Sequence, residues 1–600
     1  GLVNFITLEP ADFLKAVDGQ AKDTGGKAWV GYTGDDDGAI VGGTLAHRLN
    51  DTAAFSLTAT GGHANGVHNM GSNDAANVDR TTPNPQTTND GALLGKLVLR
   101  PSAMQRHALT VEHVQKNGDV ALLSSRAKPP YTGTPTTQAA AVVDESATHD
   151  MTRNRLTWDA HYSIDTPWAD QLQTVLSWQD GATEQDGQTV RKDLGVRVRK
   201  TSYRERTWQA NVQADKTLAL SNQWAQKLTY GIDYTTTDFS SFADGSDPAP
   251  LPPFTPRKYF PDTRDTAQAI YAQTELIHND WSITPGVRLD QFALDVISQD
   301  GYYPGLAKTP GKSLSGTAVS PKLGVLYRAT PQWSVYGNYA SGFRAPEGQQ
   351  VNSVYEAPTP TTYVKLLPNP DLKPEESRNL EIGVRARMDR LTLDVAAFTG
   401  LYSNLIQEKM NLGTADGLAV SPTNPTLFQT VNIDKATISG FEIQGNFLFG
   451  KVADGTLSFP FSYGTTHGSN DTTGRPLSYI DPAKLVAGVE YKTAGWDIGL
   501  NVVHRLEKNV AELDGAYIPK STTQVQFLTP AATTLDLQSQ WRLHKNTRLN
   551  FGITNLTDQK YWNWSDVQGV ASNPTAPLLP VVDAYSQPGR HINLSLVADF

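Results

Sequence analysis

The sequence predicts an all-β protein: a transmembrane antiparallel β-barrel of about 22 strands, with long loops at one end and short turns at the other. Three observations support this prediction. Segments of alternating apolar and polar residues recur along the chain, short connections alternate with long ones, and no run of about 18 apolar residues occurs. A barrel strand needs only ~9–11 residues to cross a bilayer, and every second residue faces lipid.

The composition is compatible with a barrel and excludes several functions. A hydrophobic fraction of 38 % and a mean hydropathy of −0.40 suit a barrel as well as a soluble protein, since half of each strand is polar. The absence of cysteine excludes disulfides, thiolate metal sites and cysteine nucleophiles. The net charge of −10 argues against a nucleic-acid partner. It fits a cationic or metal-bearing cargo, or solubility alone.

The alternating segments follow one another from residue 27 to the C-terminus. The last one places Ile592, Leu594 and Leu596 on one face and mostly polar residues on the other. Such a face would form the core of a soluble sandwich but would meet lipid in a barrel. The pattern is less regular between residues 185 and 240 and around residue 430. The clear segments are Lys27–Gly34, Ala39–Leu49, Ala53–Thr60, Ala92–Arg100, Arg106–Lys116, Arg153–Ile164, Leu172–Gln179, Ala267–Ile277, Ser282–Val296, Lys322–Ala329, Trp333–Gly342, Asn379–Met388, Leu391–Ser403, Phe441–Phe449, Thr456–Tyr463, Lys484–Lys492, Asp497–His504, Thr533–Leu543, Thr547–Asn555 and His591–Phe600.

The lengths of the connections favour the barrel. Short periplasmic turns and long extracellular loops typify outer-membrane barrels, whereas a sandwich or propeller has no reason to separate them. We therefore expect the long loops to form a cargo-binding mouth, or alternatively a shield facing lipopolysaccharide. The short turns lie at 50–52, 330–332, 388–390, 494–495 and 544–546, and the long loops at 61–90, 119–150, 237–264, 297–317, 344–375, 408–427, 505–530 and 563–589.

Several motifs resemble those of TonB-dependent receptors. Residues 341–346 read SGFRAP and residues 369–375 read NPDLKPE, which is similar to the FRAP and NPDLKPE pair of this family. The second motif is specific to the family, and the first narrows the resemblance towards its haem and haemoglobin receptors. Residues 552–562 resemble the family's penultimate strand, and Phe600 resembles its C-terminal aromatic residue. A purely structural role is the alternative for the motif pair, as the exit from one strand and the loop-to-strand joint of the next.

The N-terminal segment 1–14, GLVNFITLEPADFL, resembles the last strand of the family's plug domain. The resemblance implies that residues 1–14 are a remnant of the plug with its linker and that residues 15–600 form the barrel. The plug, with its TonB box, would then be largely absent, and the open lumen would be porin-like. Because the first residues lack the basic start of a signal peptide, we expect a mature or trimmed chain.

The resemblance implies a receptor in the outer membrane of a Gram-negative bacterium that imports haem, free or from haemoproteins, for iron acquisition. Its partners would be haem or a haemoprotein, the TonB–ExbB–ExbD complex acting through the plug, lipopolysaccharide and outer-membrane lipid. A receptor for a ferric siderophore or other metal chelate is the alternative, and a non-transport barrel is a third. We expect a monomer. Catalytic motifs are absent, so haem would be a transported ligand and we expect neither an enzyme nor a catalytic cofactor.

The candidate ligands lie in and beside the loop between the two motifs. Related haem receptors typically carry a histidine ligand there, but residues 347–368 contain none. Tyr355 and Tyr363 are the possible replacements, because a tyrosinate oxygen can bind ferric haem iron. Tyr355 is preferred because it lies nearer the family's ligand position, and a packing role is the alternative for both. The fork of Arg344 could bind a carboxylate or propionate of the cargo.

Neighbouring charges would influence a tyrosine ligand. A free phenol is protonated at neutral pH and binds iron poorly until it ionises. Ferric iron itself promotes most of that ionisation. Arg344 or Lys365 would assist it, whereas Glu356 would oppose it unless its side chain points away.

Overall fold

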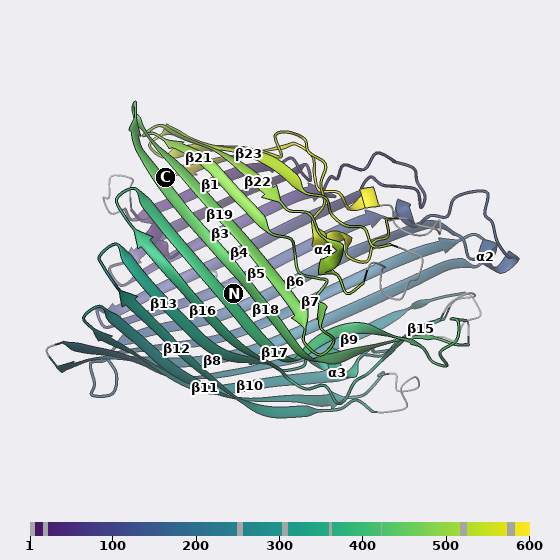
Figure 1. Cartoon of the computed structure of the whole chain (residues 1–600), viewed down its shortest axis with the longest axis horizontal. Coiled ribbons are helices and arrows are strands. Elements are labelled where there is room, and N and C mark those ends of the chain that lie inside the picture. The colour runs from purple at the N-terminus through teal and green to yellow at the C-terminus, as the bar shows by residue number, and fades with distance from the viewer. Residues whose placement is uncertain are drawn as a thin grey trace.

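The chain forms a closed barrel of 22 long antiparallel strands, as predicted. The computed structural model describes residues 7–15, 22–221, 223–248, 256–302, 310–358, 363–421, 423–515, 525–572 and 582–600. The barrel closes where β1 (Thr24–Thr33) pairs with β25 (His591–Asp599), the first and last strands of the chain (Figure 1).

The other barrel strands follow in sequence order, each paired antiparallel with the next. They are β2 (Gly38–Asn50), β3 (Ala53–Asn65), β4 (Gln86–Ser102), β5 (Gln105–Ala121), β6 (Val142–Ser163), β7 (Gln171–Arg191), β8 (Gly195–Ser221), β9 (Trp224–Ser246), β10 (Asp262–His278), β11 (Trp281–Ser298), β12 (Leu314–Arg328), β13 (Trp333–Arg344), β16 (Glu375–Arg387), β17 (Leu391–Thr414), β18 (Thr426–Val452), β19 (Gly455–Asn470), β21 (Lys484–Lys492), β22 (Trp496–Arg505), β23 (Ala532–His544) and β24 (Thr547–Thr554).

Short elements lie in the connections and beside the barrel wall. The described residues contain no helix that is long and apolar enough to span a membrane. The short elements are the strands β14 (Tyr355–Pro358), β15 (Tyr363–Leu367) and β20 (Arg475–Pro476), the helices α1 (Pro10–Phe13), α2 (Pro135–Ala139), α3 (Gly348–Asn352) and α4 (Trp564–Val567), and the 3-10 turns η1 (Leu123–Ser125), η2 (Val510–Glu512) and η3 (Val582–Tyr585).

The two ends of the barrel differ as expected, with short turns on the left of Figure 1 and loops on the right. Some predicted loop boundaries are wrong, however. Both ends of the predicted loop 119–150 are strand, because β5 runs to Ala121 and β6 begins at Val142. β8 and β18 reach 27 residues each, far more than a bilayer crossing needs. The outer parts of these strands project beyond the bilayer, so neither face there must be apolar and the alternation disappears.

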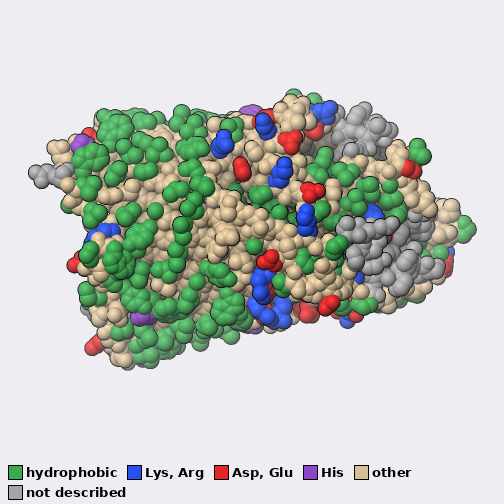
Figure 2. Space-filling view, turned by 90° about the horizontal axis from the view of Figure 1, so that it is seen from below, with side chains coloured by type: hydrophobic (Ala, Val, Ile, Leu, Met, Phe, Trp, Pro, Cys, Tyr) green, Lys and Arg blue, Asp and Glu red, His purple; other side chains and the backbone are tan. Residues whose placement is uncertain are grey.

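The outer surface of the barrel carries an apolar band. Val41, Val319 and Ile382 expose 61 %, 62 % and 59 % of their surface, and Ile592 and Leu594 are also exposed. Figure 2 shows hydrophobic side chains covering the part nearer the turns, while charged side chains gather towards the loop end. An outward-facing apolar band is the surface that contacts lipid in outer-membrane barrels. An aromatic girdle marks its turn-side edge and comprises Trp224, Trp281, Trp333, Trp496 and Trp541.

The N-terminal segment lies against barrel-wall side chains near the turns. Lys96 donates its ammonium protons to the Thr7 carbonyl and hydroxyl oxygens at 2.9 and 2.6 Å, and Arg106 pairs with both Glu9 and Asp159. Residues 1–6 of the predicted plug strand lie outside the described residues. Pro10–Phe13 forms a helical turn instead of strand, because proline suits the first turn and Asp12 accepts a hydrogen bond from the Glu9 amide. The division into residues 1–14 and 15–600 stays a prediction.

Candidate functional site

The loop between the two motifs folds into a helix and a hairpin. After α3, strands β14 and β15 pair antiparallel, with Tyr355 opposite Leu366 and Glu356 opposite Lys365. β15 then lies parallel to the start of β18, from Val364 beside Thr426 onwards. The loop therefore adds a small hairpin to the barrel sheet at its outer end.

Apolar packing holds α3 against the barrel wall. Val351 of α3 is 1 % exposed and packs with Leu294 of β11 and Leu372 of the second motif. The side chain of Asn369 donates to the Thr430 carbonyl oxygen at 2.9 Å. The helix and the second motif are thus fixed to two different barrel strands.

Hydrogen bonds fix the end of α3 to the loop that joins β11 and β12. The buried Asn352 amide accepts from the Lys312 backbone N–H at 2.8 Å and donates to the Lys312 carbonyl at 3.0 Å. The Tyr302 hydroxyl donates to the Asn352 carbonyl at 2.9 Å. Burial raises the pKa of Tyr302 to about 12, so this phenol remains a neutral donor at physiological pH. The hairpin that follows α3 therefore starts from a fixed point.

The two motifs meet at the base of this loop. Arg344, the last residue of β13, pairs with Glu375, the first residue of β16. The Arg344 guanidinium donates from Nε and Nη2 to the two Glu375 oxygens at 2.7 and 3.0 Å. Oε1 of Glu375 also accepts from the Ile406 amide at 2.6 Å. The structural interpretation of the motifs as strand exit and joint is confirmed, and the Arg344 fork would have to leave Glu375 to bind a cargo carboxylate.

A cavity of about 740 Å³ lies beside this loop, within the range of small-molecule sites. Four segments form its wall: the stretch before β10, the α3–β14–β15 loop, the outer part of β17 and the start of β18. The lining residues are Tyr259, Phe260, Gln349, Gln350, Ser353, Val354, Tyr355, Val364, Leu366, Glu408, Lys409, Phe428 and Thr430.

The two candidate tyrosines occupy different faces of the hairpin. Successive strand residues point to opposite faces, and along β15 it is Val364 and Leu366 that line the cavity. Tyr363 alternates with them, whereas Tyr355 lies opposite Leu366. Among the described residues, the cavity wall therefore includes Tyr355 but not Tyr363 or Arg344.

The neighbouring charges pair with each other on the face away from the cavity. Glu356 is 7 % exposed and its carboxylate lies 3.2 Å from the Lys365 ammonium. Both residues alternate with residues that line the cavity, so Glu356 points away from Tyr355. Lys365 is thus paired with Glu356 and not with Tyr355.

The structure adds residues that the sequence patterns missed. The ring of Tyr259 lies 5.9 Å from that of Tyr355, between centroids, at 49°. The Arg257 guanidinium lies 4.8 Å from the centre of the Tyr259 ring and donates to its hydroxyl at 3.3 Å. The Val354 amide donates to the Tyr259 carbonyl at 2.8 Å, which joins the two segments. The one feature of the sequence that could have indicated these residues is the aromatic pair Tyr259-Phe260 in a proline-rich loop.

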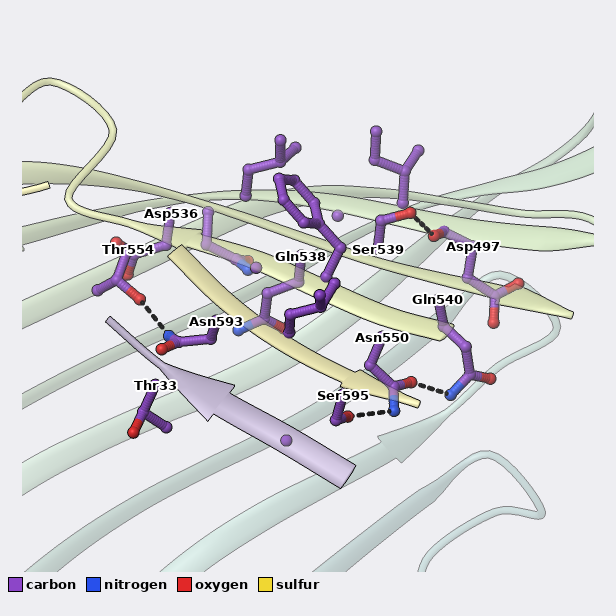
Figure 3. Close-up of a pocket in the computed structure, with 18 of the residues that line it drawn as sticks. Thr33, Asp497, Asp536, Gln538, Ser539, Gln540, Asn550, Thr554, Asn593 and Ser595 are labelled. Atoms are coloured by element: carbon purple, nitrogen blue, oxygen red, sulfur yellow. Dashed lines mark hydrogen bonds between the residues drawn. The ribbon is translucent and has the colours of Figure 1, made fainter. Parts of the chain in front are cut away.

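A second recess, of about 610 Å³, lies on the barrel wall where β21–β25 meet β1 and β2 (Figure 3). Polar side chains in this recess form hydrogen bonds with one another. The Gln540 amide donates to the Asn550 amide oxygen at 2.9 Å, and the Asn550 amide donates to the Ser595 hydroxyl at 2.9 Å. These residues alternate with the apolar outer row, so they form the polar inner face that the barrel prediction requires. The described residues contain no group of three or more His, Asp or Glu side chains that could hold a metal ion. Haem needs only one protein ligand.

Comparison with known proteins gives the family. The family model for the TonB dependent receptor-like β-barrel matches residues 98–556. The probable hemoglobin and hemoglobin-haptoglobin-binding protein 4 of Haemophilus influenzae is 27 % identical over 277 residues, 44 % of this chain and 27 % of that protein. Heme/hemopexin utilization protein C of the same species is 25 % identical over 349 residues, 56 % of this chain and 45 % of that protein. The matches thus span less than half the length of these relatives.

Solved structures share the fold. The siderophore receptor PirA from Acinetobacter baumannii gives a TM-score of 0.68 at 15 % identity, covering 96 % of this chain and 80 % of that one. The FrpB iron transporter from Neisseria meningitidis gives 0.68 at 14 % identity, covering 99 % and 83 %. Identities this low show the fold alone. Since the family model covers well over half of the sequence, the chain belongs to the TonB-dependent receptors, a family of transport receptors built on outer-membrane-type β-barrels.

Proposed function

We propose that this receptor imports haem, free or taken from a haemoprotein, and that Tyr355 binds the ferric iron. The observation that carries the proposal is the position of Tyr355 in the loop between the two motifs, on the wall of the cavity of about 740 Å³. The relatives named for hemoglobin or heme support haem as the cargo. A ferric siderophore or other metal chelate is the second candidate, because receptors for such cargo share the fold.

The chemistry of the cavity suits haem. The macrocycle is flat and apolar, and the cavity presents aromatic rings from Tyr259, Phe260 and Phe428 beside the aliphatic Leu366. A tyrosinate oxygen prefers ferric to ferrous iron. The ferric ion lowers the proton affinity of the phenol that it binds. Among the described residues of the hairpin, the Glu356 carboxylate pairs with Lys365 on the face away from Tyr355.

The apolar band supports a location in the Gram-negative outer membrane, among lipid and lipopolysaccharide. We propose that the receptor is a monomer there. Import would draw on the TonB–ExbB–ExbD complex acting through a plug domain. A chain that stays folded and monomeric in buffer without detergent would contradict this location.

Absorbance spectra of the detergent-solubilised chain titrated with haemin test the proposal. We expect a shifted Soret band and a tyrosinate-to-iron charge-transfer band. Tyr355→Phe keeps the ring but removes the ligand oxygen, so the charge-transfer band should disappear. Tyr363→Phe is the matched control and should leave it unchanged. An unaltered charge-transfer band in Tyr355→Phe would remove Tyr355 from the mechanism. If haemin causes no spectral change and the protein binds ferric siderophores instead, the second candidate is selected.

A further inference from the structure

A β-bulge in β17 lies on the wall of the Tyr355 cavity. Gln407 and Met410 of β17 pair with Val431 and Gln429 of β18, so three steps along one strand match two along the other. Glu408 and Lys409 together therefore oppose the single residue Thr430. Lys409 has a φ of +49°, in the left-handed region that residues with a side chain rarely adopt.

The bulge changes where side chains point. In a regular strand, consecutive side chains project from opposite faces. Here the consecutive residues Glu408 and Lys409 both line the cavity, together with Thr430 across the strand pair. Bulges are common beside binding sites, where they redirect a side chain. Left-handed backbone at a residue other than glycine is likewise concentrated at such sites. The distortion thus places the neighbouring residues Glu408 and Lys409 together on the cavity wall.

Lys409 differs from the neighbouring cations in its ion pairing among the described residues. In the part of the chain that the structure describes, Lys409 has no carboxylate within 4.0 Å. The two cations that the sequence analysis singled out are both paired, Arg344 with Glu375 and Lys365 with Glu356. The neighbouring Glu408 carboxylate accepts a hydrogen bond from the Gln350 side chain at 2.7 Å.

We propose that Lys409 binds a carboxylate of the cargo, which for haem is a propionate. The identity of that cargo rests on the proposed function, but the chemistry is shared by other anionic ferric chelates. A lysine ammonium acts as a mobile point charge with three donors, which suits a flexible propionate. Lys409 therefore takes the anion-binding role that the sequence suggested for Arg344, while Tyr355 binds the metal.

Lys409→Asn tests the proposal, because asparagine tolerates the left-handed conformation and removes the charge. The probes are haemin and haemin dimethyl ester, whose carboxylates are blocked. We expect Lys409→Asn to weaken haemin binding about 10- to 100-fold, the range for a hydrogen bond to a charged group. Binding of the ester should be equal in the variant and the wild type. Lys409→Arg should retain most of the haemin affinity.

Lys435→Asn is the matched control, since Lys435 is an exposed lysine of β18 that does not line the cavity. It should leave the affinity for haemin unchanged. Equal weakening of haemin and ester by Lys409→Asn, or no weakening of either, overturns the proposal. If the wild type binds no haemin, the proposed function fails. An anionic ferric siderophore then replaces haemin, and undiminished binding by Lys409→Asn overturns the inference separately.

Discussion

Asn352 fixes the loop that carries Tyr355, and its removal should loosen that loop without unfolding the barrel. Asn352→Ala deletes two hydrogen bonds to Lys312, at 2.8 and 3.0 Å, from a residue that is 2 % exposed. Two buried hydrogen bonds at about 1 kcal/mol each give roughly 2 kcal/mol of local stability. A factor of ten in equilibrium corresponds to about 1.4 kcal/mol, so the loop should open roughly 30 times more often.

A second variant calibrates this magnitude. Tyr302→Phe removes only the hydrogen bond to the Asn352 carbonyl, at 2.9 Å, and should increase opening by about fivefold. Hydrogen exchange measures both, at the amides of Val351, Ser353 and Val354, which are bonded within or from the loop. The amides of β16 serve as the internal control. Equal exchange in Asn352→Ala and wild type, or faster exchange throughout β16, would refute the argument that these bonds act locally.

Three further predictions concern the same loop. A Cβ on Gly348 would lie 2.6 Å from Oγ1 of the fully buried Thr263, so Gly348→Val should displace α3 and abolish the haemin charge-transfer band. Gly495→Val, where an added Cβ meets nothing within 4 Å, should retain it, and both variants should migrate like the folded wild type on unheated gels. Glu408→Gln removes the negative charge beside Lys409 and should tighten haemin binding a few-fold in a Soret titration; weaker binding would contradict the anion-binding role. Because burial raises the pKa of Tyr302 to about 12, its bond to the loop should be fully present below pH about 10 and lost as the pH rises through about 12. Loop exchange, corrected for its intrinsic pH dependence, should therefore accelerate only above pH 10, and Tyr302→Phe should lack that step.

The barrel could be predicted from the sequence wherever lipid constrains one face of a strand. In β25 and β16 every second residue must be apolar and the others face a polar lumen, so the alternation is regular. The constraint ends where the strands leave the bilayer. In β8, residues 197–206 include Arg197, Arg199, Arg204 and Arg206, on both faces of the strand, and no period of two in hydrophobicity survives. The pairing of β8 with β7 and β9 is nevertheless continuous there, through backbone hydrogen bonds that carry no sequence signal.

The candidate site was predictable only as far as the motifs reach. The motif pair correctly delimits the loop, because Arg344 and Glu375 close its base. Which tyrosine faces the cavity depends on the register of β14 against β15, and that hairpin is held in place by parallel pairing with β18, about 60 residues further along the chain. A single residue of slip would exchange Tyr355 for its neighbour.

Lys409 illustrates the other reason why part of the site could not be predicted. In an undistorted β17, either Glu408 or Lys409 would face the cavity, but not both. The inserted residue and the positive φ place both there, and neither feature is visible in a stretch that reads as ordinary polar strand. Since a left-handed lysine is unfavourable without compensation, the surrounding strand pairing must hold it. The β17–β18 pairing resumes at Met410 beside Gln429 and, after a second irregularity between Asn411 and Gly413, reaches Thr414 beside Thr426, so paired residues flank the distortion on both sides. It is thus a fixed feature of the cavity wall, which is what a positioned anion contact requires.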